Sequence, residues 1–180
     1  PEAFPTEVSR RRFKARARRT FKVRHPYIPR GYAIGELKET GELVYVFQYI
    51  EGISLSTVLS NTKMISEKAA LAVCIQLADA LGCCHERGII HGNLKPSNVL
   101  IARSGQAYLL DAGLERTTEH AVRNVRDGQP VSEKLAEGLP YINPGSAAGD
   151  DELSQQDDVY GLGALFYRMI SGRSPYSGTP

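Results

Sequence analysis

Apolar residues recur at helical spacing in three parts of the chain. The first part, residues 8–23, predicts a helix that ends at His25-Pro26, because the residue before a proline is pushed out of the helical region. The second predicts a long helix from about Glu67 to Glu86, with Ser66 as its N-cap and Gly88 as its stop. The apolar residues that recur along this second helix are Leu71, Cys74, Ile75, Ala78 and Leu81.

The third part, about residues 156–170, is apolar nearly all round. A helix of this kind usually lies in the middle of a domain. Gly172 is expected to end it. Its apolar residues are Val159, Leu162, Leu165, Phe166, Met169 and Ile170.

Residues 31–50 predict two strands around a turn at residues 39–41. The second strand is expected from Leu43 to Ile50, where β-branched and aromatic residues are concentrated. Residues 51–61 predict a loop that enters a short helix.

Two further short strands are expected in "NVLIA" and "AYLLDA", on either side of a turn at residues 103–105. Residues 115–138 are polar and show no period, which predicts a loop. Together these elements predict a mixed α+β fold.

The composition is that of a soluble globular protein, with 42% hydrophobic and 23% charged residues. The 180 residues are enough for one domain or for part of a larger one, and the start at Pro1 leads us to expect an excised segment. We find no apolar run long enough to span a membrane. Three cysteines without a CxxC pair predict neither a disulfide framework nor a zinc site, so we expect a reduced, cytoplasmic protein.

Positive charge is concentrated at the start of the chain. Residues 1–30 hold ten Lys or Arg against two Glu, hence +8, and residues 31–180 hold twelve against eighteen Asp or Glu, hence −6. The basic block from Arg10 to Arg24 predicts either a patch for nucleic acid or an anionic surface, or a solvated helix with its few apolar residues packed inward. We prefer the second interpretation, because the interleaved aromatics that stack on bases are missing. The inward-packing residues are Phe13, Phe21 and Val23.

A polar loop, residues 91–98, leads into the two short strands and then into Asp111-Ala112-Gly113. At this point the chain resembles the protein-kinase family, whose catalytic loop H-R-D-L-K-P-x-N is followed by a hairpin and D-F-G. Here the loop reads His91-Gly92-Asn93-Leu94-Lys95-Pro96-Ser97-Asn98, and its interval to Asp111 is that of the family.

Further landmarks of the family follow in order. "VFQYIEGISL" resembles the hinge between the lobes, with Phe47 as gatekeeper and residues 48–52 as linker. "YINPGS" resembles the Y-x-A-P-E element, and "DVYGLGALFYRMISGRSPY", beginning at Asp158, resembles the central helix.

The resemblance implies an incomplete α+β protein-kinase fold. Residues 1–50 would be part of the N-lobe, and residues 51–180 the core of the mainly helical C-lobe. The family's glycine-rich loop and V-A-I-K strand are missing, and because both precede the first helix in kinases we expect them upstream of Pro1.

The resemblance also implies a site for ATP and Mg²⁺. Asn98 and Asp111 stand at the metal-ligand positions and offer the hard oxygen ligands that Mg²⁺ takes. Lys95 resembles the loop lysine that approaches the transferred phosphate, and Leu100 is placed to sit under an adenine ring. The implied nucleotide-binding residues are Gln48, Ile50, Leu100, Asn98 and Asp111.

Asn93 stands where the family has its catalytic Asp. An amide can orient a hydroxyl but cannot take its proton at any useful pH. General-base help is typically worth about 10²–10⁴-fold, so its loss does not by itself establish inactivity. Asn93 also fits an amide that simply stabilises the loop.

Five other positions depart from the family's pattern. Counted without gaps, Arg16 replaces the Glu that pairs with the phosphate-binding Lys. Thr20 and Ala112 replace the Leu and Phe of an apolar column that joins the lobes. Gly92 replaces the Arg that receives a phosphorylated loop residue, and Gly145 replaces the Glu that anchors the end of the segment.

The scaffold is expected to be kept, with Asp158 holding the backbone of the turn at His91 and Gly92. The sequence therefore predicts a pseudokinase, a regulatory or binding module with weak or no phosphoryl transfer and weak or no binding of ATP and Mg²⁺. The alternative is an active or low-activity Ser/Thr kinase that uses Asn98, Asp111 and an upstream Lys. A remote alternative is a binder of nucleic acid or an anionic surface through the basic block. We expect a protein partner rather than nucleic acid. Among protein kinases, the sequence most resembles Ser/Thr kinases of bacterial type.

Overall fold

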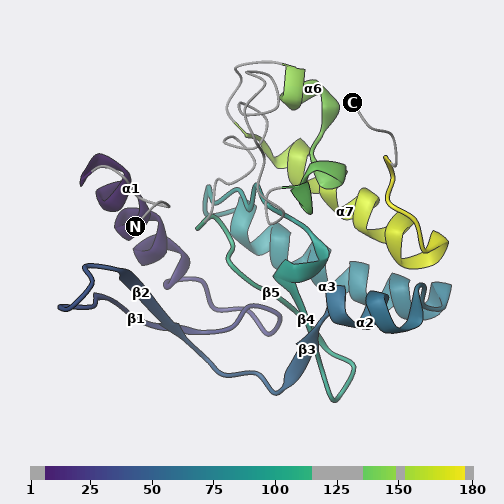
Figure 1. Cartoon of the computed structure of the whole chain (residues 1–180), viewed down its shortest axis with the longest axis horizontal. Helices are drawn as coiled ribbons and strands as arrows, with labels where there is room; N and C mark the ends of the chain where they lie inside the picture. Colours follow the sequence, from purple (N-terminus) through teal and green to yellow (C-terminus); the bar gives the residue numbers. More distant parts are fainter. Residues whose placement is uncertain (1–6, 115–135, 149–152, 177–180) are drawn as a thin grey trace.

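A helix and a β-hairpin lie beside a larger, mainly helical part (Figure 1). The structure, a computed structural model, describes residues 7–114, 136–148 and 153–176. The loop predicted over residues 115–138 lies almost wholly outside these ranges.

The first part consists of helix α1 (Glu7–Thr20) and the strands β1 (Gly31–Glu36) and β2 (Leu43–Phe47). The two strands pair antiparallel, and the turn between them contains Gly41 at a φ of 68°, a conformation that glycine adopts readily. Phe13 and Ala17 of α1 are buried against this sheet. The inward packing predicted for the basic helix is therefore confirmed for Phe13.

The second part contains a three-stranded antiparallel sheet in the order β3-β4-β5. Its strands are β3 (Gly52–Ser54), β4 (Val99–Ala102) and β5 (Ala107–Leu109). The sequence predicted the last two but not β3, because three residues are too short to show a strand period.

Helices make up the rest of the second part. The two long ones, α3 (Glu67–His85) and α7 (Gln155–Ser171), pack against each other. The shorter elements are α2 (Leu55–Thr62), α6 (Pro144–Ala148) and the 3-10 turns at Pro96–Asn98 and Leu139–Tyr141.

The ends of α3 and α7 agree with their predicted signals. The side chain of Ser66 accepts a hydrogen bond from the Ala69 amide at 3.3 Å and caps α3. Gly172 ends α7 in the left-handed conformation, with a φ of 70°. Two elements are shorter than predicted. Helix α1 ends at Thr20 rather than at residue 23, and strand β2 ends at Phe47 rather than at Ile50.

The buried face of α3 differs from the one that its large apolar residues indicated. Leu71 and Ile75 are 54% and 60% exposed. The residues that pack inward are Ala70, Val73, Leu77, Ala80, Leu81 and Cys84. Helix α7 is likewise buried on one face rather than all round, with Val159 64% exposed.

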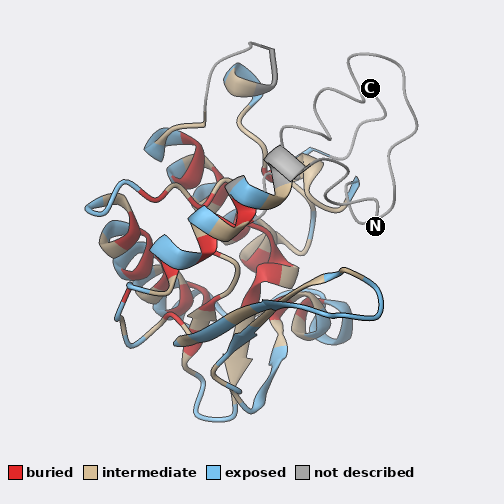
Figure 2. Cartoon of the chain, turned by 90° about the vertical axis from the view of Figure 1, so that its left-hand side faces the viewer, coloured by how far each residue is buried: buried red, intermediate tan, exposed pale blue. Residues whose placement is uncertain are grey.

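The larger core cluster lies between the helices and the three-stranded sheet, whereas the β1–β2 hairpin carries no buried residue (Figure 2). Helix α3 is the one described helix that is long and apolar enough to cross a membrane by length and composition alone, contrary to our expectation from the sequence. Such a helix is weak evidence of a span, because the core helix of a soluble protein passes the same test, and α3 packs against α7 and β5.

Candidate active site

The loop at residues 91–98 is held by a carboxylate from the central helix. Asp158, at the start of α7, is 1% exposed. Its Oδ2 accepts a hydrogen bond from the His91 amide at 2.9 Å, and its Oδ1 accepts one from the Gly92 amide at 2.8 Å. The predicted role of Asp158 is therefore confirmed.

His85, the last residue of α3, shares this carboxylate. Its Nε2 lies 2.7 Å from Oδ2 of Asp158. One buried Asp158 side chain thus joins the end of α3, the start of α7 and the loop between them. His85 could not be identified from the sequence, because no motif at the end of α3 points to it.

The ring of His91 extends this support to the segment that follows the loop. Its Nδ1 accepts a hydrogen bond from the Asn93 amide at 3.2 Å, which leaves the ring proton on Nε2. That Nε2 lies 2.9 Å from the Leu110 carbonyl and donates to it. The residue before Asp111 is therefore tied directly to the loop.

The segments that carry the two proposed metal ligands, Asn98 and Asp111, are connected by a backbone hydrogen bond. Nδ2 of Asn98 donates to the Asn93 carbonyl at 2.8 Å, which leaves the amide oxygen of Asn98 as the group for a cation. The Leu110 amide donates to the Asn98 carbonyl at 2.9 Å, which brings Asp111 beside Asn98. Asp111 has a φ of 56°, which Asp tolerates better than most residues.

This donor set fits Mg²⁺ with phosphate and water oxygens as the remaining ligands. An amide oxygen and a carboxylate supply two hard ligands, and Mg²⁺ typically takes only one or two from the protein. Among the described residues no group of three or more His, Cys, Asp or Glu could hold a metal by itself. A bound Mg²⁺ would neutralise phosphate charge, and Asn98 and Asp111 would hold it.

Asp111 also lies close to the first sheet. Burial, with the Asp111 charge as a second cause, raises the pKa of Tyr45 on β2 well above its usual range. Tyr45 stacks on Phe47, with ring centroids 5.0 Å apart. Leu114, three residues after Asp111, is buried in one cluster with Phe13 and Ala17 of α1, and Tyr45 packs against this cluster, so the segment after β5 lies against the first part of the structure.

The remaining nucleotide-site candidates lie on the connection between the two sheets and on β4. The Gln48 amide donates to the Arg30 carbonyl at 2.7 Å, which fastens the start of the connection. Ile50 follows it, half-buried, and Leu100 is a half-buried residue at the centre of β4, paired with Ser54 and Tyr108. Their contact with adenine stays a prediction.

Thr20 and Ala112 stand where the family has the Leu and Phe of an apolar column. The two residues contact each other, as predicted by counting along the sequence without gaps. Both are buried, at 8% and 2% exposed. The Thr20 hydroxyl donates to the Ala112 carbonyl at 2.8 Å. A buried hydrogen bond thus connects α1 to the segment after β5, where the family packs apolar side chains.

Gly92 has a φ of 68°, where a residue with a Cβ is strained by roughly 1–2 kcal/mol. A Cβ there would also meet Leu153 Cδ1 at 2.6 Å, although that side chain can move aside. The backbone of this turn is therefore suited to glycine, and an Arg could not be restored without strain.

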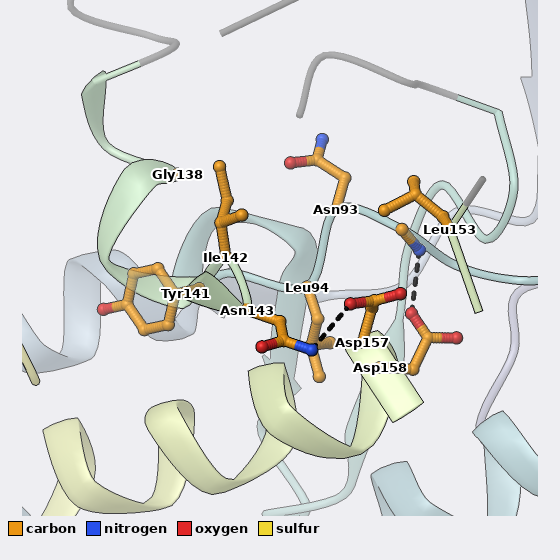
Figure 3. Close-up of a pocket in the computed structure, with 10 residues that line it drawn as sticks. Asn93, Leu94, Gly138, Tyr141, Ile142, Asn143, Leu153, Asp157 and Asp158 are labelled. Carbon is orange, nitrogen blue, oxygen red and sulfur yellow. Dashed lines mark hydrogen bonds between the residues drawn. The ribbon is translucent and has the colours of Figure 1, made fainter. Parts of the chain in front are cut away.

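A second carboxylate anchors the segment in which Gly145 replaces the family's Glu (Figure 3). Asp157 Oδ1 accepts hydrogen bonds from Asn143 Nδ2, at 3.0 Å, and from the Ser146 hydroxyl. Its Oδ2 accepts from the amide and the hydroxyl of Ser154, at 2.7 and 2.8 Å. Burial works to raise the pKa of Asp157, but these hydrogen bonds outweigh it and hold the pKa below its usual value.

Figure 3 shows the small cavity between these carboxylates and the loop. The Asn93 side chain points away from Asp157 and Asp158. The cavity measures about 20 Å³, which is room for one water molecule and not for a nucleotide. It therefore belongs to the scaffold under the loop.

Comparison with known proteins identifies this arrangement. The protein kinase domain family matches residues 14–180. The serine/threonine-protein kinase PknA of Mycobacterium tuberculosis is 33% identical over 172 residues, which cover 93% of this chain and 38% of PknA. The serine/threonine-protein kinase pkn2 of Myxococcus xanthus is 38% identical over 172 residues, which cover 93% of this chain and 20% of pkn2. The chain thus spans less than half the length of these relatives.

The fold is that of the same family. The kinase domain of PknI from Mycobacterium tuberculosis matches with a TM-score of 0.74 and 24% sequence identity, over 98% of this chain and 62% of that one. The predicted α+β protein-kinase-like fold, present in part, is therefore confirmed. This chain belongs to the protein kinase domain family, as the loop, the Asp-Ala-Gly segment and the central helix indicated.

Proposed function

We propose that this domain is a pseudokinase, a regulatory or binding module with weak or no phosphoryl transfer, which acts on a protein partner in the cytoplasm. The observation that carries the proposal is a firmly held catalytic loop with an amide, Asn93, at the position of the base. Phosphoryl transfer relies on positioning, electrostatics and an oriented base, and here the base is replaced while the scaffold that holds the loop is kept.

The surroundings of the loop support the same reading. The turn at Gly92 has a glycine conformation, and the Thr20–Ala112 hydrogen bond replaces an apolar contact. Both features fit a domain whose stable shape has been retained for binding.

The alternative, a kinase of low activity, is favoured by one specific observation. A backbone hydrogen bond from Leu110 to Asn98 connects the segments that carry Asn98 and Asp111, both of which offer oxygen ligands, and Lys95 remains in the loop. Kinases typically use ATP and Mg²⁺, and these residues suit that pair.

Phosphate transfer from radiolabelled ATP, measured on the intact protein with Mg²⁺ and with Mn²⁺, separates the two functions. We expect incorporation close to that of an Asp111→Ala variant, because the base position carries an amide and Arg16, Gly92 and Ala112 depart from the family's pattern as well. Incorporation that is clear in the wild type and lost in Asp111→Ala would establish the low-activity kinase instead.

A further inference from the structure

Glu137 lies two residues before the 3-10 turn Leu139–Tyr141, and its carboxylate reaches into the catalytic loop. Its Oε2 lies 3.6 Å from Nζ of Lys95. The same oxygen accepts a hydrogen bond from the Ser97 hydroxyl at 3.0 Å. Its Oε1 accepts a longer one, 3.5 Å, from the Ser56 hydroxyl in the first turn of α2.

The burial of Lys95 makes its contact with Glu137 energetically important. The Lys95 side chain is 3% exposed, so its ammonium group needs counter-charge and hydrogen-bond acceptors from the protein. The Glu137 side chain is 37% exposed, so it reaches the loop from the surface. The carboxylate can therefore leave toward solvent, whereas the lysine stays in place.

An ammonium group and two hydroxyls that converge on a carboxylate are also the donors that hold a phosphoryl group. Both ligands are oxyanions, and both accept charge-assisted hydrogen bonds. The family resemblance already assigns Lys95 to the transferred phosphate. We propose that Glu137 acts as an internal ligand beside Lys95, Ser97 and Ser56, and that it occupies the place that a phosphoryl group would take.

Closure has a direct consequence for ligands with phosphates. An incoming phosphoryl group must displace Glu137 or lie beside its negative charge, and both lower the apparent affinity. The inference rests on the proposed function, since it gives one physical cause for weak nucleotide binding. A partner that draws the segment around Glu137 away from the loop would open the site.

The test compares Glu137→Gln with the wild type by isothermal titration of the intact protein, in the presence of Mg²⁺. Three probes are used: ATP, inorganic tripolyphosphate and adenosine. We expect Glu137→Gln to bind ATP and tripolyphosphate at least tenfold more tightly, because the side chain keeps its size but loses its charge. Adenosine, which carries no phosphate, should bind both proteins equally.

Glu86→Gln is the matched control. Glu86 also lies 3.6 Å from a cation, Arg87, but its side chain is 79% exposed, and the substitution changes the net charge by the same amount. We expect it to leave all three affinities unchanged. If Glu137→Gln bound tripolyphosphate more tightly than the wild type but bound ATP with unchanged affinity, the site would take a phosphoryl group that does not come from the nucleotide.

Equal affinity of wild type and Glu137→Gln for both phosphate probes would overturn the proposal, including the case in which neither protein binds them. Should Glu137→Gln fail to fold, Glu137→Asp draws the charge back by one methylene, and a smaller rise in affinity is expected. Phosphate transfer by the wild type would contradict the proposed function but not this site, so the two failures can be told apart.

Discussion

Replacing Asp158 with alanine is expected to lower the free energy of unfolding by about 3–5 kcal/mol, because each buried donor left without its acceptor costs about 1–3 kcal/mol. The carboxylate is 1% exposed and accepts hydrogen bonds from the His91 and Gly92 amides as well as contacting His85. Alanine would leave these buried donors without their acceptor. The loss is large because one residue holds three separate segments together.

The chain offers a matched control in its other His–Asp pair. His25 Nε2 lies 3.3 Å from Oδ2 of Asp79, whose side chain is 62% exposed. Exposed pairs contribute about 0–1 kcal/mol, so Asp79→Ala should leave stability nearly unchanged. Urea unfolding of the intact protein measures both variants, and equal losses would show that Asp158 is not the anchor of the loop.

Replacing Thr20 with valine is expected to lower the free energy of unfolding by about 1–3 kcal/mol, the cost of leaving a buried polar group unsatisfied. Valine keeps the shape of threonine but cannot donate to the Ala112 carbonyl, which Thr20 reaches at 2.8 Å. The hydrogen bond connects α1 to the segment after β5, so its loss should also loosen the position of α1.

The Thr20→Ser variant distinguishes the contribution of the hydroxyl to stability from that of the methyl group. Serine keeps the donor and loses one buried methyl, worth about 1 kcal/mol. Denaturant unfolding together with hydrogen exchange of the α1 amides measures both effects. A valine variant as stable as the wild type would mean that the hydrogen bond does not join the two parts of the domain.

Much of the fold could be predicted where a local signal was strong. Ser66 and Gly172 mark helix ends through capping geometry, which depends on nearby residues only. The buried face of α3 could not be chosen in the same way. This helix is apolar on several sides, and the small residues Ala70 and Ala80 pack inward while the larger Leu71 lies outside.

The candidate site was predictable to the extent that its residues follow one another in a motif. Asn93, Lys95 and Asn98 come from one loop, and Asp111 ends the following hairpin, so their meeting needed only the predicted strands. Glu137 and His85 were missed for a different reason. They reach the loop through the tertiary fold, and the stretch around Glu137 carries no periodic signal.

We propose that the catalytic machinery of this domain is degraded at several positions on a retained scaffold, so that Asn93 is not the only obstacle to phosphoryl transfer. Phosphate transfer from radiolabelled ATP by an Asn93→Asp variant of the intact protein tests this most directly. General-base help is worth about 10²–10⁴-fold where the rest of a site is intact. Because Arg16, Gly92 and Ala112 would remain, we predict that Asn93→Asp raises transfer less than tenfold above the Asp111→Ala background. A rise of a hundredfold or more would contradict the account and place this domain one substitution away from an active kinase.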